Sequence, residues 1–230
     1  LNKSFKSVTI ETLLLFMVIP RKINFTQLER YGKRCEQCYR QTFTKEFDWI
    51  RYNMELMNTL FDRNDRKAIA IDPSYISKSG KHTPWIGYFW SGCAGQAKRG
   101  LEILGVGAID IDKRDCVMLK AEQTPDTITL DNVGCTLIDW YLKVLERIKD
   151  RLLEVSNYVV ADAYFSKATF AKGLDSMGFH LVSRFRDDAN LMYIHDGQPT
   201  GKRGRPKVHG DKIDFKHLDY TKIQEIETNN

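Results

Sequence analysis

The stretch VVADAYFSK, residues 159–167, decides the fold because it places an acid where an apolar strand ends. Its first three residues continue a strand pattern that starts at Tyr158, and the pattern turns helical after Asp162. The stretch AIAIDPSYISKSG, residues 68–80, repeats this arrangement, with Asp72 following four apolar residues. Two acids that are distant in sequence therefore each follow a short apolar strand.

The pattern around these stretches predicts an α/β fold, a mixed sheet with helices packed on it. The Gly/Ser/Lys turn between Lys78 and Pro84 predicts that the first strands form a hairpin and then a meander. In this order of elements the first and fourth strands can lie side by side, so their ends can bring Asp72 and Asp162 together. Strands are expected over 68–72, 85–90, 101–111, 158–161 and 179–185, and helices over 131–155 and 167–177.

Residues 1–65 are predicted to form a separate helical domain that carries an excess of basic residues. Apolar residues spaced by threes and fours predict one amphipathic helix over 41–60. Two interpretations of the basic surface stay open, a DNA-binding domain and an ordinary bundle with a solvated charged face. The remaining chain is expected to divide into an α/β core over 66–190 and a segment with a basic loop over 191–230.

Two carboxylates held close together are typical of a magnesium site, because Mg²⁺ prefers carboxylate and water oxygens. Two such ions about 4 Å apart activate a water and stabilise the leaving oxygen in phosphodiester cleavage. The alternative is that each acid caps the element that follows it, as Asp162 would cap a helix. Capping is the better interpretation for either acid alone, and metal binding is the better one for Asp72 and Asp162 together.

Composition narrows the class of protein. The chain has 230 residues, a net charge of +5 and five cysteines, and an odd number of cysteines argues against a secreted disulfide framework. The longest apolar run, Leu13–Ile19, is far shorter than the roughly 20 residues of a membrane span. With no signal peptide visible, the expected location is the cytoplasm, with no membrane contact.

The strongest local charge cluster is the loop GKRGRPK, residues 201–207. An extended Arg-Gly-Arg-Pro run fits an A·T-rich minor groove, where arginine meets enhanced negative potential. Contacts to phosphates are expected more than base reading, and a solvated loop without a partner is the alternative. The candidate DNA-binding residues are Lys202, Arg203, Arg205 and Lys207.

The stretches AIAIDPSYISKSGKHT, YFWSG, NYVVADAYFSK, LVSRFRDDANL and GKRGRPKVHGDKI together resemble a bacterial insertion-sequence transposase with a DDE catalytic site. The resemblance implies an RNase H-like core preceded by a DNA-binding region, with Asp72 and Asp162 as the first two catalytic and metal-binding acids. It implies Mg²⁺ or Mn²⁺ as the cofactor. The implied partners are double-stranded DNA, as transposon ends and target, and further copies of the chain, in a bacterial cytoplasm and associated with the nucleoid.

The sequence departs from the family pattern at the third acid, a glutamate on a later helix. Glu225 and Glu227 are the only late glutamates, and Tyr220 is followed three residues later by Ile223 where the family has arginine. We therefore expect a C-terminally incomplete transposase. Three functions stay open: DNA transposition, a non-catalytic DNA-binding repressor derived from a transposase, and a different RNase H-like nuclease such as a resolvase.

Overall fold

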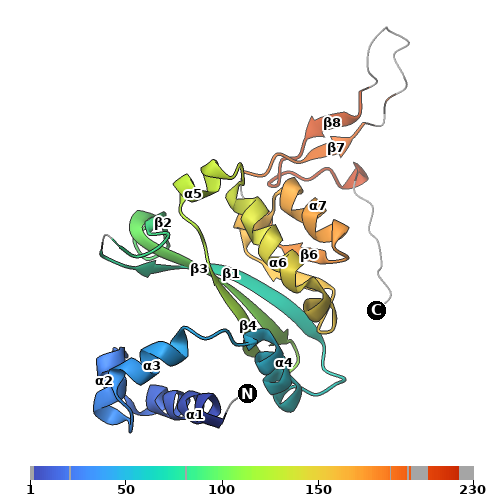
Figure 1. Ribbon diagram of the computed structural model, residues 1–230. Helices are drawn as coiled ribbons and strands as arrows, with labels where there is room; N and C mark the ends of the chain where they lie inside the picture. Colours follow the sequence, from blue (N-terminus) through green and yellow to red (C-terminus); the bar gives the residue numbers. More distant parts are fainter. Residues whose placement is uncertain are drawn as a thin grey trace. The chain divides into compact units, whose positions relative to one another are not determined.

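The computed structural model describes residues 3–20, 22–80, 82–186, 188–195, 197 and 207–222. The chain divides into two compact units, Leu1–Arg63 and Asn64–Asn230. Unit 1 contains helices α1 to α4, and unit 2 contains both sheets and the remaining helices (Figure 1).

Unit 1 is a small helical unit with an apolar core of its own. Side chains cap two of its helices, since Asn24 accepts a hydrogen bond from the Gln27 amide and Asp48 accepts one from the Arg51 amide. The single helix predicted over 41–60 is wrong, because the chain leaves the helical path after residue 43 and Asp48 starts a new helix. The helices are α1 (Lys3–Val18), α2 (Phe25–Tyr31), α3 (Glu36–Phe43) and α4 (Trp49–Leu60). The core consists of Val8, Leu15, Ile19, Leu28 and Tyr39.

Unit 2 is built on a mixed sheet in which β3 is the longest strand. One edge of β3 pairs antiparallel with the whole of β1, and its other edge pairs antiparallel with β2 and β4. On the far side of β1, β5 and β6 follow in parallel. This arrangement, β4-β3-β1-β5-β6, confirms the predicted mixed sheet and the RNase H-like order that the resemblance implied. The strands are β1 (Lys67–Ser77), β2 (Gly87–Ser91), β3 (Gln96–Asp110), β4 (Asp115–Gln123), β5 (Tyr158–Ala161) and β6 (His180–Ser183).

Two expectations about the strands are wrong. The first two predicted strands do not form a hairpin, because β3 pairs with both β1 and β2. The sequence prediction also missed β4, which buries only Val117 and Leu119 of its nine residues. Two buried side chains give a weak alternation, and the remaining positions carry polar or exposed residues.

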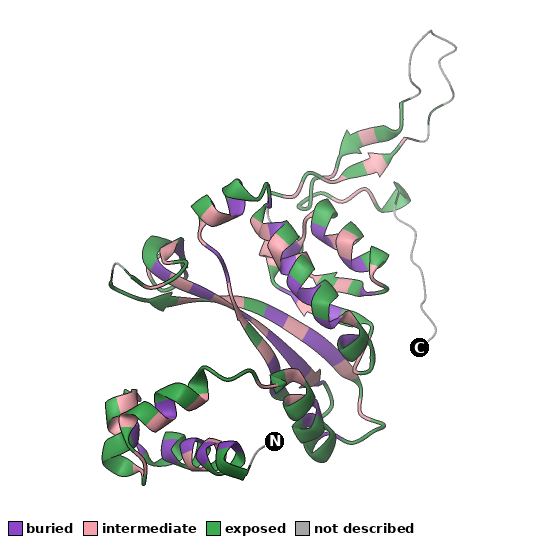
Figure 2. Ribbon diagram, in the orientation of Figure 1, coloured by how far each residue is buried: buried purple, intermediate pink, exposed green. Residues whose placement is uncertain are grey.

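Three α-helices lie between the strands of unit 2, α5 and α6 after β4 and α7 between β5 and β6, and α6 and α7 pack together. Figure 1 shows α6 and α7 side by side, with α7 next to β6. The helix predicted from residue 131 begins later, because Gly134 adopts a φ of 61° and Thr136 forms a capping box with Asp139. The buried face of α6 is visible in Figure 2 and includes Tyr141 and Leu145. The helices are α5 (Thr127–Asn132), α6 (Leu137–Leu153) and α7 (Ala168–Ser176).

A second sheet of two strands, β7 (Met192–Ile194) and β8 (His209–Lys212), follows the main sheet. A short 3₁₀ helix, η2 (Tyr220–Lys222), comes after it. None of the helices in the described ranges has the length and apolar character needed to cross a membrane.

Candidate active site and DNA-contact surfaces

The parallel pairing of β1 with β5 brings the two predicted acids to neighbouring positions. Ile69 pairs with Val159 and Ala70 with Val160, so the same register continued by two residues sets Asp72 opposite Asp162. Asp162 directly follows β5, as predicted. Asp72 does not end its strand, because β1 continues through Ser77 along β3. It lies where β1 extends beyond the end of β5.

Both carboxylates are exposed, and one oxygen of each accepts a hydrogen bond from a residue two positions later. Asp72 Oδ2 accepts a bond of 3.3 Å from the Ser74 hydroxyl. Asp162 Oδ1 accepts a bond of 3.0 Å from the Tyr164 amide and so caps the 3₁₀ helix η1 (Ala163–Phe165). Within the described residues the other oxygen of each carboxylate has no protein donor. The capping interpretation of Asp162 is therefore correct, and the cap still leaves one oxygen open.

The turn that carries Asp162 is anchored from two sides. The Ser183 hydroxyl, at the end of β6, donates to the Asp162 backbone oxygen at 2.8 Å. Phe165 is fully buried, with its ring centroid 5.5 Å from that of Tyr141 on α6 and 4.8 Å from that of Phe170 on α7. These contacts fix the backbone that presents the carboxylate.

The pKa values of two tyrosines near this turn, Tyr164 and Tyr141, are raised. Burial raises the pKa of Tyr164, and the nearby carboxylates of Glu102 and Asp162 raise it further. Burial and the same two carboxylates also raise the pKa of Tyr141, whose hydroxyl donates to Glu102 at 2.6 Å. Tyr141 and Tyr164 therefore both lie close enough to Glu102 and Asp162 for these carboxylates to disfavour their ionisation.

The donor set fits a divalent cation. Two exposed carboxylates at neighbouring positions, each with an oxygen free of protein donors, match the preference of Mg²⁺ for carboxylates that leave room for water. No group of three or more His, Cys, Asp or Glu side chains suited to a metal occurs within the described ranges. The late glutamates Glu225 and Glu227 lie outside those ranges.

Two further acids near the end of β3 do not join the site. Asp110 is buried, and its carboxylate accepts hydrogen bonds from the amides of Asp112 and Lys113 in the β3–β4 turn. Asp112 pairs with Arg66 at 2.7 Å. Asp110 also lies opposite Lys67, at the start of β1. Both acids stabilise that turn.

The predicted basic loop falls mostly outside the described residues. Lys202, Arg203 and Arg205 lie there, so their placement stays a prediction. Lys207 is described, and it is exposed shortly before β8.

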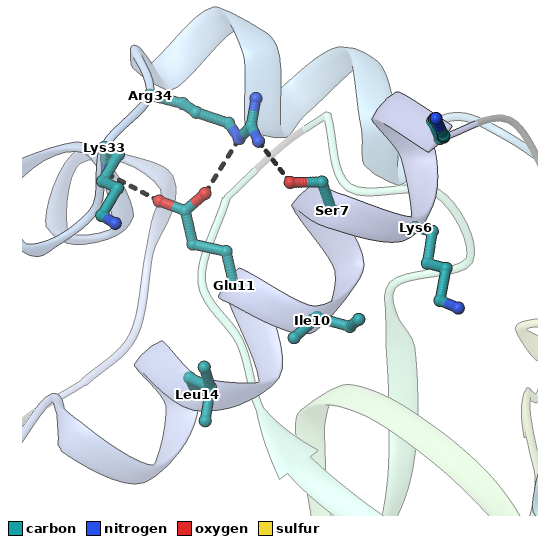
Figure 3. A pocket seen from close by; sticks show the side chains of 8 residues that line it. Lys6, Ser7, Ile10, Glu11, Leu14, Lys33 and Arg34 are labelled. Atoms are coloured by element: carbon teal, nitrogen blue, oxygen red, sulfur yellow. Dashed lines mark hydrogen bonds and ion pairs between the residues drawn. The ribbon is translucent and has the colours of Figure 1, made fainter.

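Unit 1 has a cavity of about 500 Å³ with basic walls (Figure 3). Its basic residues come from the first turns of α1 and from the segment between α2 and α3. Ile10 and Leu14 add apolar surface. The sequence analysis predicted an excess of basic residues over 1–65 but had no signal that α1 would set lysines beside Lys33 and Arg34. The basic residues are Lys3, Lys6, Lys33 and Arg34.

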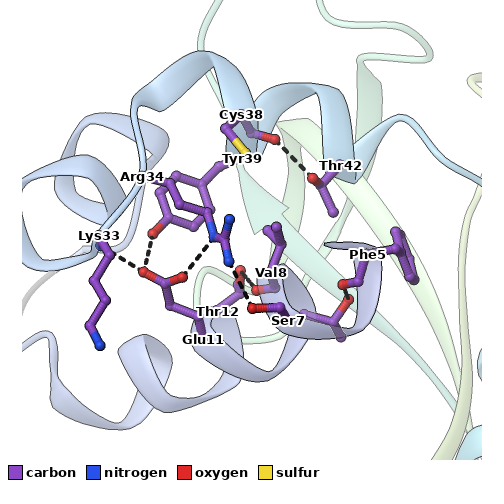
Figure 4. A network of polar contacts seen from close by, with 11 residues as sticks. Phe5, Ser7, Val8, Glu11, Thr12, Lys33, Arg34, Cys38, Tyr39 and Thr42 are labelled. Carbon is purple, nitrogen blue, oxygen red and sulfur yellow. Dashed lines mark hydrogen bonds and ion pairs between the residues drawn. The ribbon is translucent and has the colours of Figure 1, made fainter. Parts of the chain in front are cut away.

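One carboxylate holds this cavity together. Glu11 accepts hydrogen bonds from the Lys33 amide, the Arg34 guanidinium and the Tyr39 hydroxyl (Figure 4). Burial opposes the ionisation of Glu11, but these hydrogen bonds and the charge of Arg34 outweigh it and lower its pKa. Glu11 therefore ties α1 to the segment after α2, and no ion pair is found for the three lysines of the cavity among the residues that the structure describes.

Comparison with known proteins gives a family and a distant structure. A family model described as DDE superfamily endonuclease matches residues 26–228. The crystal structure of the Mos1 mariner paired end complex with Mn is similar over 76% of this chain and 57% of that chain, with 11% sequence identity and a TM-score of 0.27. This chain thus spans little more than half the length of that one, and the likeness adds no argument to the topology above. No curated protein matches the chain.

Proposed function

Since the chain belongs to the DDE superfamily endonuclease family, we propose that it is a transposase that cuts transposon ends and joins them to target DNA. Asp72 and Asp162 would hold the divalent metal, Mg²⁺ or Mn²⁺. The observation that supports the proposal is the parallel pairing of β1 with β5, because the same register continued by two residues would bring these two acids to neighbouring positions.

The bound metal would supply Lewis-acid activation of water and of the DNA 3′-hydroxyl. The chain's own residues position the donors. The Tyr164 amide fixes the Asp162 carboxylate through Oδ1, and Ser74 fixes Asp72 through Oδ2. Carboxylates held in this way need little rearrangement to bind a cation, and such preorganisation is a general feature of functional sites.

DNA would also be held by basic residues other than those next to the two acids. The cavity of unit 1 has four basic residues and one acid that is already engaged by the fold. The loop that contains Arg203 and Arg205 would add contacts in the minor groove or along the phosphates. Binding should weaken steeply with salt, because each neutralised phosphate releases counterions.

The test is a comparison of Asp72→Asn and Asp162→Asn with Asp150→Asn, an exposed acid on α6. Mn²⁺ binding is measured by titration calorimetry, nicking of supercoiled plasmid by gel, and duplex DNA binding by fluorescence anisotropy. We expect both site variants to lose Mn²⁺ binding and nicking and to keep DNA binding. Wild-type Mn²⁺ affinity in either site variant would refute the metal assignment. DNA binding without nicking in the wild type would favour the non-catalytic repressor.

A further inference from the structure

Positive charge collects beside Asp162, on the segments that follow the two paired strands β5 and β6. Ala161 and Ser183 end these strands as register partners. Lys167 lies five residues after Asp162 and directly precedes α7, and Arg186 lies three residues after Ser183. The Ser183 hydroxyl ties the second segment to the first through the Asp162 backbone oxygen.

The Lys167 ammonium is held in place but is not neutralised. Its Nζ lies 3.9 Å from the ring centroid of Tyr164, the residue whose amide donates a hydrogen bond to the Asp162 carboxylate. Burial lowers the pKa of Lys167, and the positive charge of Arg186 lowers it further. No carboxylate in the described part of the chain forms an ion pair with Lys167. The fold thus keeps a half-buried cation next to a second cation.

Arg186 is only partly engaged. Its Nε and one terminal nitrogen donate to the two oxygens of Asp188, at 2.8 and 3.0 Å. The guanidinium has five N–H donors in a planar fork, so donors remain for another acceptor. Half of its side-chain surface is exposed.

We propose that Lys167 and Arg186 form a binding subsite for a backbone phosphate of the DNA strand that passes the Asp72–Asp162 pair. A phosphodiester is the ligand that would relieve both the burial of the ammonium and the repulsion between the two cations. The aromatic ring of Tyr164 sets the ammonium in position without cancelling its charge. This inference rests on the proposed function and names the residues that would align the strand with the acids.

The test uses Lys167→Gln, the charge-retaining Lys167→Arg, and Lys172→Gln as a matched control. Lys172 is an exposed lysine on α7. Binding of a fluorescein-labelled 20-base-pair duplex is followed by anisotropy in EDTA over a range of KCl concentrations. We expect Lys167→Gln to weaken binding about ten-fold, as for the loss of one charge-assisted hydrogen bond. The slope of log affinity against log salt should become about 0.9 smaller, as for one phosphate contact.

Lys167→Arg should restore both the affinity and the slope, and Lys172→Gln should resemble the wild type. A Lys167→Gln protein with the slope and affinity of Lys172→Gln would overturn the inference. A lower melting temperature with an unchanged slope would also overturn it, because a purely structural cation–π contact predicts that result. Failure of the wild type to bind the duplex at all would overturn the proposed function itself, so the two failures are distinguishable.

Discussion

The buried hydrogen bond between Tyr141 and Glu102 links the sheet to the turn of Asp162, and Tyr141→Phe tests what it contributes. Tyr141 is fully buried, and Glu102 on β3 is 6% exposed. The hydroxyl donates to Glu102 Oε1 at 2.6 Å, and the tyrosine ring packs on Phe165 of η1. The substitution keeps the ring and removes only the donor.

The expected loss follows from the cost of leaving a buried acceptor without its donor. A hydrogen bond to a charged group contributes about 1.5–3 kcal/mol, so we expect the free energy of unfolding of unit 2 to fall by about 2 kcal/mol. For a domain of this size that corresponds to a melting temperature roughly 4–8 °C lower. Glu102→Gln keeps an acceptor of the same shape and removes the charge, so its cost should stay below about 1 kcal/mol.

The assay is urea unfolding followed by tryptophan fluorescence in a Trp49→Phe background. Trp49 is the one tryptophan of unit 1, and the other three lie in unit 2, so the signal reports unit 2 alone. In the Glu102→Gln background Tyr141→Phe should cost about 1 kcal/mol less than in the wild type, which is a coupling energy between the two residues. A loss of less than about 0.5 kcal/mol in the free energy of unfolding of Tyr141→Phe would refute the reasoning. The hydrogen bond to Glu102 would then be no stronger than the hydrogen bond to water that it replaces.

Three further outcomes are expected. Gly32→Ala should destabilise unit 1 by about 1–3 kcal/mol in urea unfolding, because an added Cβ overlaps the Tyr39 hydroxyl and lies 2.6 Å from a carbonyl oxygen. In unit 2, Gly92→Ala should leave the free energy of unfolding nearly unchanged, because an added Cβ there meets nothing within 4 Å. Burial and the hydrogen bond to a carboxylate raise the pKa of Tyr39 to about 12. The tyrosine therefore ionises at lower pH in the unfolded state than in the folded state, so unit 1 should lose stability between pH 10 and 12. This loss, followed by the fluorescence of the tryptophan of unit 1, should be larger than in the Tyr39→Phe variant. Arg203→Ala with Arg205→Ala should lower the salt slope of DNA binding by about 0.9 for each phosphate that these arginines neutralise, and an unchanged slope would mean that the loop does not touch phosphate.

The sequence predicted the strands that carry the acids because those strands are short, apolar and followed by an abrupt change of pattern. β5 was predicted with its observed bounds, 158–161. β1 was predicted to end at Asp72 because the apolar run ends there and the next residues, Pro73 and Ser74, do not continue it. Pairing with β3, which only the three-dimensional arrangement supplies, keeps residues 73–77 extended.

The sequence prediction missed residues around the site because their roles depend on contacts with residues that are distant in sequence. Lys167 belongs to the stretch 159–167, but the sequence did not indicate a role for it. Its closeness to Arg186 becomes visible only when β6 pairs with β5 and brings Arg186 to the same edge of the sheet. Glu102 sits within a strand whose pattern was otherwise apolar, and a buried acid in such a strand needs a donor. That donor is Tyr141, 39 residues later in the chain, a separation that local patterns do not reach.

Capping and metal binding were opposed interpretations of Asp162, but the geometry makes them compatible. A carboxylate has two oxygens, and the Tyr164 amide uses one of them. The cap restricts rotation of the carboxylate, so the entropy of fixing the ligand is lost on folding and not when the cation binds. Removing the cap while keeping the carboxylate would therefore weaken metal affinity without removing a ligand. A turn that begins with a capping aspartate directly after a parallel strand is for this reason a suitable place for a metal ligand.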